Sequence, residues 1–312
     1  MLSYTRLMLK SVVAIGVMVL VLAFCFSYAG HARNRIYNII NPIEGELLFH
    51  SNRNGNYDIY HLSFHTGNGR RELTQITDFE TDTMNPSYSP DGTMIAYQSR
   101  NHIDYGSPLE WSLYIMDADG ANPRMVALGF NPVWLPDNEH IVYSNWHDSY
   151  VTRQRQIRYN HQLYIVNIET GIIHILEYDS DEYTLIFPDD VDITTLYPSW
   201  RSWFIISPQS DLYQGHGIFS PDGEQAVYAR VYRFLHETSG IFIINENIEI
   251  SELLWQAHSN YITWSPDSRY IAYDALHPEY TMVIAVYAID GSNWHPLIGN
   301  DGFTYGHPSW RP

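Results

Sequence analysis

A short phrase recurs along the chain and constrains its fold more than any other feature. In its full form it reads aromatic-Ser-Pro-Asp-Gly, as in residues 88–92, with close variants at 134–138, 219–223 and 264–268 and a half copy at 307–312. Its prolines are 46, 85, 45 and 46 residues apart, at Pro90, Pro136, Pro221, Pro266 and Pro312. A period near 45 residues with several strands per unit is typical of β-propeller blades.

Runs rich in β-branched and aromatic residues follow each phrase and predict the strands of a blade. First runs occupy residues 94–97, 140–143, 225–228 and 270–273, and second runs occupy 113–116, 163–166, 241–244 and 283–286. Short apolar runs bounded by Gly, Pro, Asn and Asp indicate β-strands. One unit therefore contains strand a at 86–89, an Asp-Gly turn, strand b at 93–99, strand c at 112–117 and strand d at 124–128.

The two ends of the repeat region are expected to meet. The first strand b begins near Glu46 without a phrase before it, and residues 308–311 supply a strand a with no strand b after it. Pairing these two strands would close a ring and remove exposed sheet edges. The fold class predicted is an all-β, closed β-propeller of four-stranded blades over residues 45–312.

The step of 85 residues is nearly twice the period and affects the number of blades. We expect six blades. One of them is degenerate and lies between residues 176 and 217, with strands at 197–200 and 203–206. Five blades with an insertion is the alternative.

The N-terminal region predicts export. Arg6 and Lys10 precede residues 11–29, an uncharged stretch long enough for one hydrophobic helix across a bilayer. Ser27 and Ala29 also fit a signal-peptidase site. The expected domains are a signal anchor or signal peptide at 1–30, a linker at 31–44 and the propeller at 45–312. The propeller would lie outside the cytoplasm, periplasmic or extracellular, on a single-pass anchor at 11–29, or be secreted if the signal is cleaved.

The repeats resemble those of a known family. The phrase at residues 88–92, the Ile-Ala-Tyr that follows it, and the stretch 112–120 are similar to the Pro-Asp repeats of TolB-like β-propellers, the propellers of TolB and of prolyl-oligopeptidase-like proteins. The resemblance implies the fold and a binding scaffold used in many settings, and some related propellers act on polysaccharides. The chain has no Gly-x-Ser-x-Gly motif, so no hydrolase domain is predicted.

Composition excludes several partners and chemistries. All 35 acidic residues lie beyond residue 43 and give the chain a formal net charge of −18, which argues against nucleic acid and anionic lipid as partners of the domain. Cys25 is the only cysteine, so no disulfide and no cysteine-based metal site is expected. The 15 histidines are scattered, and we predict no catalytic residue, metal ligand or cofactor.

Candidate binding residues lie in the connections between strands b and c, at residues 101–110, 145–160, 231–239 and 275–280. These connections are long, variable and rich in Tyr, Trp, His and Arg, and they are expected on one face of the propeller, the loop face. Variable loops on a rigid scaffold commonly carry binding function. The alternative is that they are solvated loops with some packing aromatics. The predicted binding residues are Tyr105, Trp146, His147, Arg153, Arg155, Arg158, Tyr232, Arg233 and His236.

The three arginines at 153, 155 and 158 are the only basic cluster of the acidic domain. They would pair with carboxylates of residues 177–192, an acidic stretch expected to be a connection between strands d and a on the same face, or meet an acidic ligand.

These observations predict a non-catalytic, membrane-tethered scaffold of the cell envelope that binds a protein or glycan ligand. A polysaccharide lyase or hydrolase with a site on the same loop face is the first alternative, and a structural subunit of an envelope complex is the second. The oligomeric state is not predicted.

Overall fold

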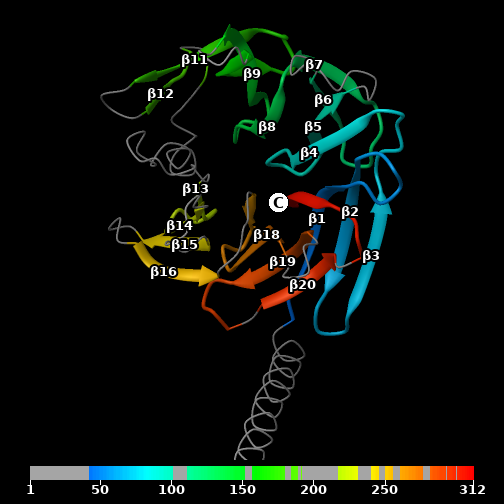
Figure 1. The fold of residues 1–312 in the computed structure, drawn as a ribbon. Helices are drawn as coiled ribbons and strands as arrows, with labels where there is room; N and C mark the ends of the chain where they lie inside the picture. Colours follow the sequence, from blue (N-terminus) through cyan, green and yellow to red (C-terminus); the bar gives the residue numbers. More distant parts are fainter. Residues whose placement is uncertain are drawn as a thin grey trace, which may run out of the picture. The chain divides into compact units, whose positions relative to one another are not determined.

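Antiparallel β-sheets make up the regular structure of the described part of the chain (Figure 1). The computed structural model describes residues 42–100, 111–151, 157–179, 184–188, 191, 217–230, 240–245, 250–255, 261–276, 282–292, 294–299 and 301–312. In these ranges no helix is long and apolar enough to cross a membrane. The predicted anchor at 11–29 and the predicted degenerate-blade strands at 197–200 and 203–206 lie outside the described residues.

Four of the sheets have four strands each. The first has the order β21 (Tyr305–Trp310), β1 (Glu44–Ser51), β2 (Asp58–His65) and β3 (Arg70–Gln75), and the second runs β4 (Asp82–Tyr88), β5 (Met94–Arg100), β6 (Ser112–Asp117) and β7 (Arg124–Leu128). Two more run β13 (Gly217–Phe219), β14 (Gln225–Arg230), β15 (Gly240–Asn245), β16 (Ile250–Trp255), and β17 (Ile262–Trp264), β18 (Tyr270–Leu276), β19 (Met282–Ala288), β20 (Trp294–Gly299). The prediction of four-stranded propeller blades is confirmed for these sheets.

The remaining sheet has five strands and corrects one prediction. Its order is β12 (Thr184–Ile186), β11 (Ile173–Asp179), β10 (Ile157–Asn167), β9 (His140–Val151) and β8 (Phe130–Trp134). The stretch 177–192 was expected to be a connection, but residues 184–186 pair with 177–179 as an added outer strand. The number of blades in the whole chain stays a prediction.

The expected pairing between the two ends of the repeat region is confirmed. Strand β21 pairs antiparallel with β1, with Leu47 opposite Trp310 and Ser51 opposite Tyr305. Beyond the strand, the Arg311 backbone N–H donates to the Glu46 carbonyl at 2.9 Å, and its guanidinium Nη1 lies 2.6 Å from the Glu46 carboxylate. The last strand of the sequence therefore completes the first sheet.

The described residues divide into two compact units. The smaller one includes residues 42–44 and 65–70, where the Ile43 N–H donates to Thr66 Oγ1 at 2.9 Å and the Thr66 N–H donates to the Ile43 carbonyl at 2.9 Å. All features described below belong to the larger unit.

The recurring Ser-Pro-Asp-Gly phrase forms a turn, as predicted. Ser89 Oγ donates to Asp91 Oδ1 at 2.7 Å, the Thr93 N–H donates to the same oxygen at 3.0 Å, and Gly92 has φ of 69°. The same Ser-to-Asp hydrogen bond occurs at residues 220–222 and 265–267. Because these aspartates accept hydrogen bonds within their own turns, they serve the a–b turn rather than a catalytic set.

Hydroxyl groups join the first strands of neighbouring sheets. Ser309 Oγ accepts from the Tyr88 N–H at 3.1 Å, and Thr263 Oγ1 accepts from the Trp310 N–H at 3.3 Å. The strands β17, β21, β4 and β8 therefore follow one another across the sheets, and all four lie near the middle of the view in Figure 1. These innermost strands are the ones that border the candidate site.

One buried aromatic residue repeats in the second strand of successive sheets. Phe49, Tyr97, Tyr143 and Tyr273 are each at most 2% exposed. Burial raises the pKa of the three tyrosines, so their hydroxyls stay protonated. In each of these four strands the residue directly after the aromatic is polar.

Candidate functional site

The residues after these aromatics place polar groups at the ends of the second strands. They are His50 on β1, Gln98 on β5, Ser144 on β9 and Asp274 on β18. His50, Gln98 and Asp274 are 4%, 4% and 2% exposed. Buried polar groups need hydrogen-bond partners, so these positions mark a polar cluster inside the fold.

The innermost strands supply the second half of the cluster through an unusual backbone conformation. Asn85, Asn131 and His307 each precede a proline and have φ of 53°, 55° and 52°. The pairing with the second strand is irregular at the same step in all three sheets. A non-glycine residue in this region costs about 1–2 kcal/mol, and such strain clusters at functional positions.

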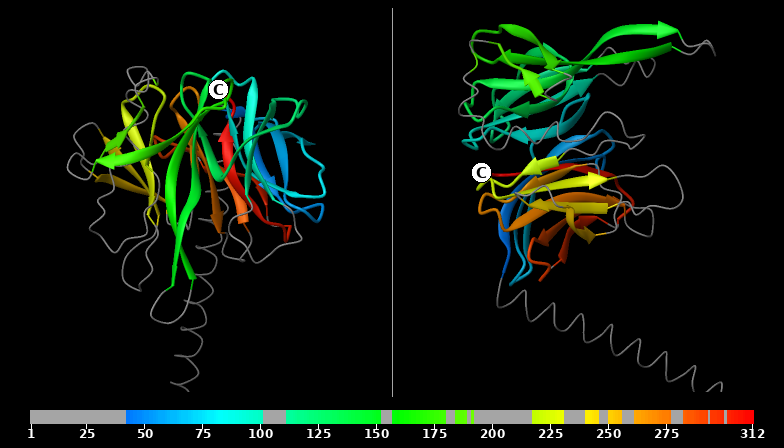
Figure 2. Two further views of the ribbon diagram at one scale, coloured as in Figure 1. Left: turned by 90° about the horizontal axis from the view of Figure 1, so that it is seen from above. Right: turned by 90° about the vertical axis from the view of Figure 1, so that its left-hand side faces the viewer.

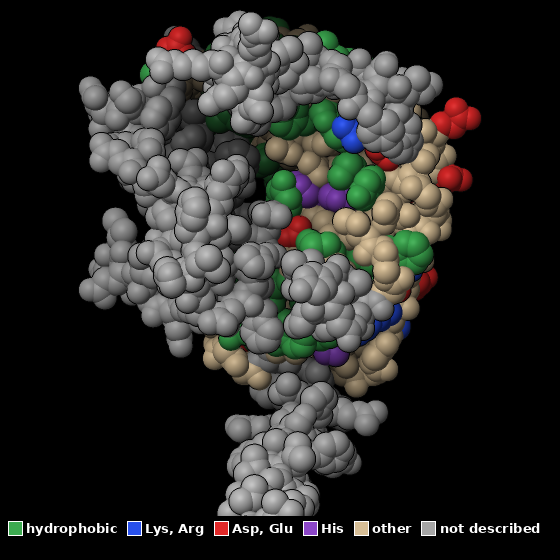
Figure 3. Space-filling view, viewed as in Figure 1, with side chains coloured by type: hydrophobic (Ala, Val, Ile, Leu, Met, Phe, Trp, Pro, Cys, Tyr) green, Lys and Arg blue, Asp and Glu red, His purple; other side chains and the backbone are tan. Residues whose placement is uncertain are grey.

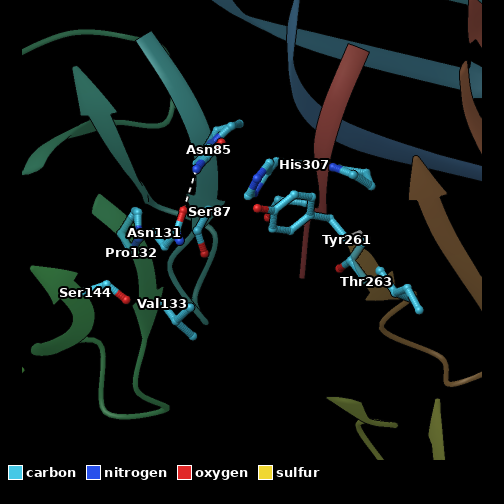
Figure 4. A pocket seen from close by; sticks show the side chains of 13 residues that line it. Asn85, Ser87, Asn131, Pro132, Val133, Ser144, Tyr261, Thr263 and His307 are labelled. Atoms are coloured by element: carbon cyan, nitrogen blue, oxygen red, sulfur yellow. Dashed lines mark hydrogen bonds between the residues drawn. The ribbon is translucent and has the colours of Figure 1, made fainter. Parts of the chain in front are cut away.

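Hydrogen bonds fix the orientation of the two asparagines. Gln98 Oε1 accepts from the Asn131 backbone N–H at 2.8 Å and from Asn85 Nδ2 at 2.8 Å. Asn85 Nδ2 also donates to Asn131 Oδ1 at 2.6 Å (Figure 4). Because a backbone N–H can only donate, Gln98 must accept with its oxygen, and Asn85 must therefore turn its nitrogen toward both partners.

This arrangement leaves one buried acceptor without a partner. The Asn85 side chain is 7% exposed, and its Oδ1 has no hydrogen bond to any described residue. A buried polar atom of this kind costs roughly 1–3 kcal/mol unless a ligand or water satisfies it. The oxygen has less than 1 Å² of accessible surface, so a ligand in the cavity described below cannot reach it, and its cost is carried by the fold.

His50 closes the cluster from behind. Its Nδ1 accepts from the Asn85 backbone N–H at 3.3 Å, and its ring lies 5.4 Å from the His307 ring and 5.6 Å from the Tyr57 ring, between centroids. Burial lowers the pKa of His50 to about 3, so the imidazole is neutral with its proton on Nε2. The close packing also requires Gly306, since a Cβ there would lie 2.9 Å from His50 Nε2.

A cavity of about 290 Å³ opens in front of the cluster. Its walls come from β4, β8, β9, β21 and the start of β17, and Figure 4 shows the side chains of these strands around it. In the wider view, histidine and hydrophobic side chains, with an acidic side chain beside them, lie along the described side of a central hollow (Figure 3). Its described lining residues include no Asp, Glu, Lys or Arg. The described part of the lining therefore combines apolar side chains with uncharged hydrogen-bonding groups and His307.

Tyr261 forms the wall opposite the asparagines. Its backbone N–H donates to Asp274 Oδ1 at 3.1 Å, and its ring contacts that of His307. Burial, with the nearby Asp274 carboxylate, raises the pKa of Tyr261 to about 12. At neutral pH the phenol is protonated and offers a donor rather than a base.

Most of the binding residues predicted from sequence lie outside the described residues: Tyr105, Arg153, Arg155, Tyr232, Arg233 and His236. The backbones of Trp146 and His147 lie on β9, and that of Arg158 lies on β10. Trp146 is opposite His161, and Arg158 is opposite Tyr150.

The stretch 145–160 was predicted as an irregular connection, and this is wrong for most of it. Strands β9 and β10 continue their pairing until Val151 lies opposite Ile157. Figure 2 shows this long hairpin. The alternation of polar and bulky residues in 145–160 suits an extended ribbon, but its histidines and asparagines resemble loop composition. The structure therefore brings Trp146, His147 and Arg158 onto one ribbon.

Sequence reasoning missed the cavity residues, although a signal for them exists. The residue before proline in the innermost strand and the residue after the aromatic in the second strand recur with the blade period. Both positions were treated as strand structure. His50, Gln98 and Asp274 lie within two residues of the ends of β1, β5 and β18, the strand ends from which the b–c connections leave.

The described residues contain no group of three or more His, Cys, Asp or Glu side chains arranged to hold a metal ion. Asp274 accepts from the Tyr261 N–H, and His50 accepts from the Asn85 N–H. The rings of His50 and His307 lie 5.4 Å apart, between centroids.

Comparison with known proteins supports the fold. No protein-family model and no curated protein sequence matches the chain. The crystal structure of TolB from Acinetobacter baumannii superimposes with a TM-score of 0.55 at 14% identity, over 86% of this chain and 67% of that protein. A putative TolB from Agrobacterium tumefaciens gives a TM-score of 0.36 at 12% identity, over 86% and 99% of the two chains. An oligogalacturonate lyase in complex with manganese gives 0.33 at 15% identity, over 82% and 62%.

The chain thus spans about two thirds of the Acinetobacter protein and has the fold of a TolB-like β-propeller.

Proposed function

We propose that the chain is a non-catalytic binding scaffold of the cell envelope that holds its ligand at the cavity end of the innermost strands. The observation that carries this proposal is the pair Asn85 and Asn131, held in a strained backbone conformation by Gln98 and facing a preformed cavity. A site fixed by backbone strain and hydrogen bonds does not have to reorganise when a ligand binds.

The chemistry of the described lining supports binding over catalysis. A lyase or hydrolase needs a base or acid with a suitable pKa near its substrate, and a polyuronate substrate also needs a cation. The described lining has no carboxylate and no Lys or Arg, and His50 is buried behind it with its pKa lowered to about 3. Polysaccharide cleavage, the alternative function, would have to use His307 or Tyr261, the titratable side chains in the described lining.

The proposed setting rests on the sequence. Residues 11–29 tether the protein as a signal anchor, residues 31–44 act as a linker, and the propeller faces the periplasm or the exterior. The resemblance to TolB-like propellers fits an envelope scaffold with a protein partner. Under this proposal the partner docks over the loop face, where Trp146 and Arg155 make contacts.

Affinity capture from an envelope extract tests the proposal. The full-length protein should capture a specific partner, and Trp146→Ala combined with Arg155→Ala should abolish that capture. Ile172→Ala combined with Arg124→Ala is a matched control, because both side chains are 49% exposed and lie next to c–d turns, at the strand ends opposite to the b–c connections. Capture that survives the first pair of changes unaltered would contradict the proposed docking face.

Turnover is measured in parallel on a panel of polysaccharides. We expect none. Turnover that a single histidine substitution removes would replace the binding scaffold with the enzyme.

A further inference from the structure

The cavity presents hydrogen-bonding groups of known direction. Asn131 uses its Oδ1 to accept from Asn85, which leaves its Nδ2 to donate. Ser309 and Thr263 accept backbone N–H groups with their hydroxyl oxygens, so their own protons are left to donate. A fitting ligand must therefore accept hydrogen bonds at several closely spaced points.

The rest of the wall is apolar and flat. The prolines Pro86, Pro132 and Pro308 and the ring of Tyr261 line the cavity between the polar groups. Pyranose rings combine a rim of hydroxyls, each able to donate and accept, with faces of C–H groups. Such faces pack on aromatic and aliphatic rings through apolar contact.

Size and charge narrow the ligand class further. The cavity volume of about 290 Å³ is at the lower end for small-molecule sites and suits one or two sugar rings rather than a folded peptide loop. The described lining has no Lys or Arg to neutralise a carboxylate or phosphate.

We infer that the cavity binds a neutral saccharide unit, whose hydroxyl oxygens accept from Asn131 Nδ2 and from the hydroxyls of Ser309 and Thr263. This inference rests on the proposed binding function and assigns its ligand class. Asn85 orients Asn131, because its Nδ2 donates to Asn131 Oδ1 at 2.6 Å (Figure 4).

Titration calorimetry on the full-length protein tests the inference. The neutral probes are glucose, galactose, N-acetylglucosamine and their disaccharides, and the comparison probes are glucuronate, galacturonate and N-acetylalanine amide. We expect saturable binding of at least one neutral sugar and weaker or no binding of its uronate. Asn131→Gly, which tolerates the backbone conformation at this position, should raise the Kd about tenfold or more through loss of the amide.

Two variants keep the result interpretable. Asn122→Gly makes the same change at an exposed turn position with φ of 54°, and its Kd should equal that of the wild type. Ser87→Ala changes a second lining residue, and its Kd should rise if the sugar lies in this cavity. Thermal melting verifies that each variant is folded.

Several outcomes would overturn the inference. These are the absence of binding by all neutral sugars, a uronate or the amide binding at least as tightly as the neutral sugars, and affinity unchanged by both Asn131→Gly and Ser87→Ala. Partner capture that persists while no sugar binds would leave the proposed function standing and remove only the saccharide. Conversely, a sugar that is chemically altered during the titration would contradict the non-catalytic function itself.

Discussion

Replacement of His50 by glutamine should change how the stability of the protein depends on pH. His50 is 4% exposed, and burial lowers its pKa from an ordinary value of 6.5 to about 3. Its Nδ1 accepts the Asn85 N–H, a role that the glutamine side-chain oxygen can take over. Glutamine has no titratable group, so the variant removes the proton linkage and retains a hydrogen-bond acceptor.

The sign and size of the effect follow from linkage. Between pH 6.5 and 3 the unfolded chain binds a proton at position 50 and the folded protein does not, so acid favours unfolding. The stabilisation is fully present above pH 6.5 and is lost at about 1.4 kcal/mol per pH unit below it. From pH 7.5 to 5 the wild type should lose about 2 kcal/mol from this group, and the glutamine variant should not.

The neighbours of His50 leave this sign unchanged. Asn85, Tyr57 and His307 contact it, and Asp274 lies beside it across Gly306. These groups are present in both proteins, so the difference between wild type and variant isolates His50.

Urea unfolding at half-unit steps from pH 7.5 to 5 measures the effect. The quantity of interest is the wild-type free energy of unfolding minus that of the variant, since a constant packing penalty drops out of its pH dependence. Asp58 provides a control of opposite sign: burial raises its pKa to about 6, so its contribution to stability falls as pH rises from 3.8 to 6. A wild-type-minus-variant difference that is flat with pH would refute the buried, neutral His50.

Three further predictions concern the fold and can be measured by urea or thermal unfolding. Trp310→Ala should cost about 3–5 kcal/mol, because the indole is 7% exposed and closes the pairing of β21 with β1, whereas Phe303→Ala, at 37% exposed, should cost under about 1 kcal/mol. Gly299→Ala should lower the free energy of unfolding by at least about 2 kcal/mol, since its Cβ would lie 2.8 Å from a backbone carbonyl oxygen. Gly171→Ala should lower it by about 1 kcal/mol, because a Cβ at residue 171 would meet no atom within 4 Å. Asp91→Ala should cost about 1–2 kcal/mol through the loss of three turn hydrogen bonds, and equal stability of variant and wild type would contradict its role in the turn.

The fold was largely predictable because its determinants are local and repeated. Strands β5, β6 and β7 match the predicted strands b, c and d to within a residue at each end, since the alternation and the Asp-Gly turns fix them within the repeat. The pairing of β21 with β1 could also be predicted, because each of these two repeats lacked the strand that the other supplied. Both inferences need only spacing and turn chemistry.

The candidate site was less predictable, because it depends on which side chains meet across sheets. Asn85 and Asn131 are 46 residues apart and hydrogen bond directly, and Gln98 from a third strand accepts from both of them. The left-handed backbone before proline reverses the direction in which these side chains would point in a regular strand. Residue composition identified the variable connections instead, and the long β9–β10 hairpin shows that such composition can also form paired strands.

The central claim is that a ligand occupies the cavity beside Asn131 and leaves it chemically unchanged. The most direct measurement is a titration of wild-type protein and the Asn131→Gly variant with the ligand recovered from envelope extract, followed by mass analysis of that ligand. The account predicts an affinity at least about tenfold weaker in the variant and an unaltered ligand mass. Equal affinity in the two proteins, or a ligand of changed mass, would contradict it.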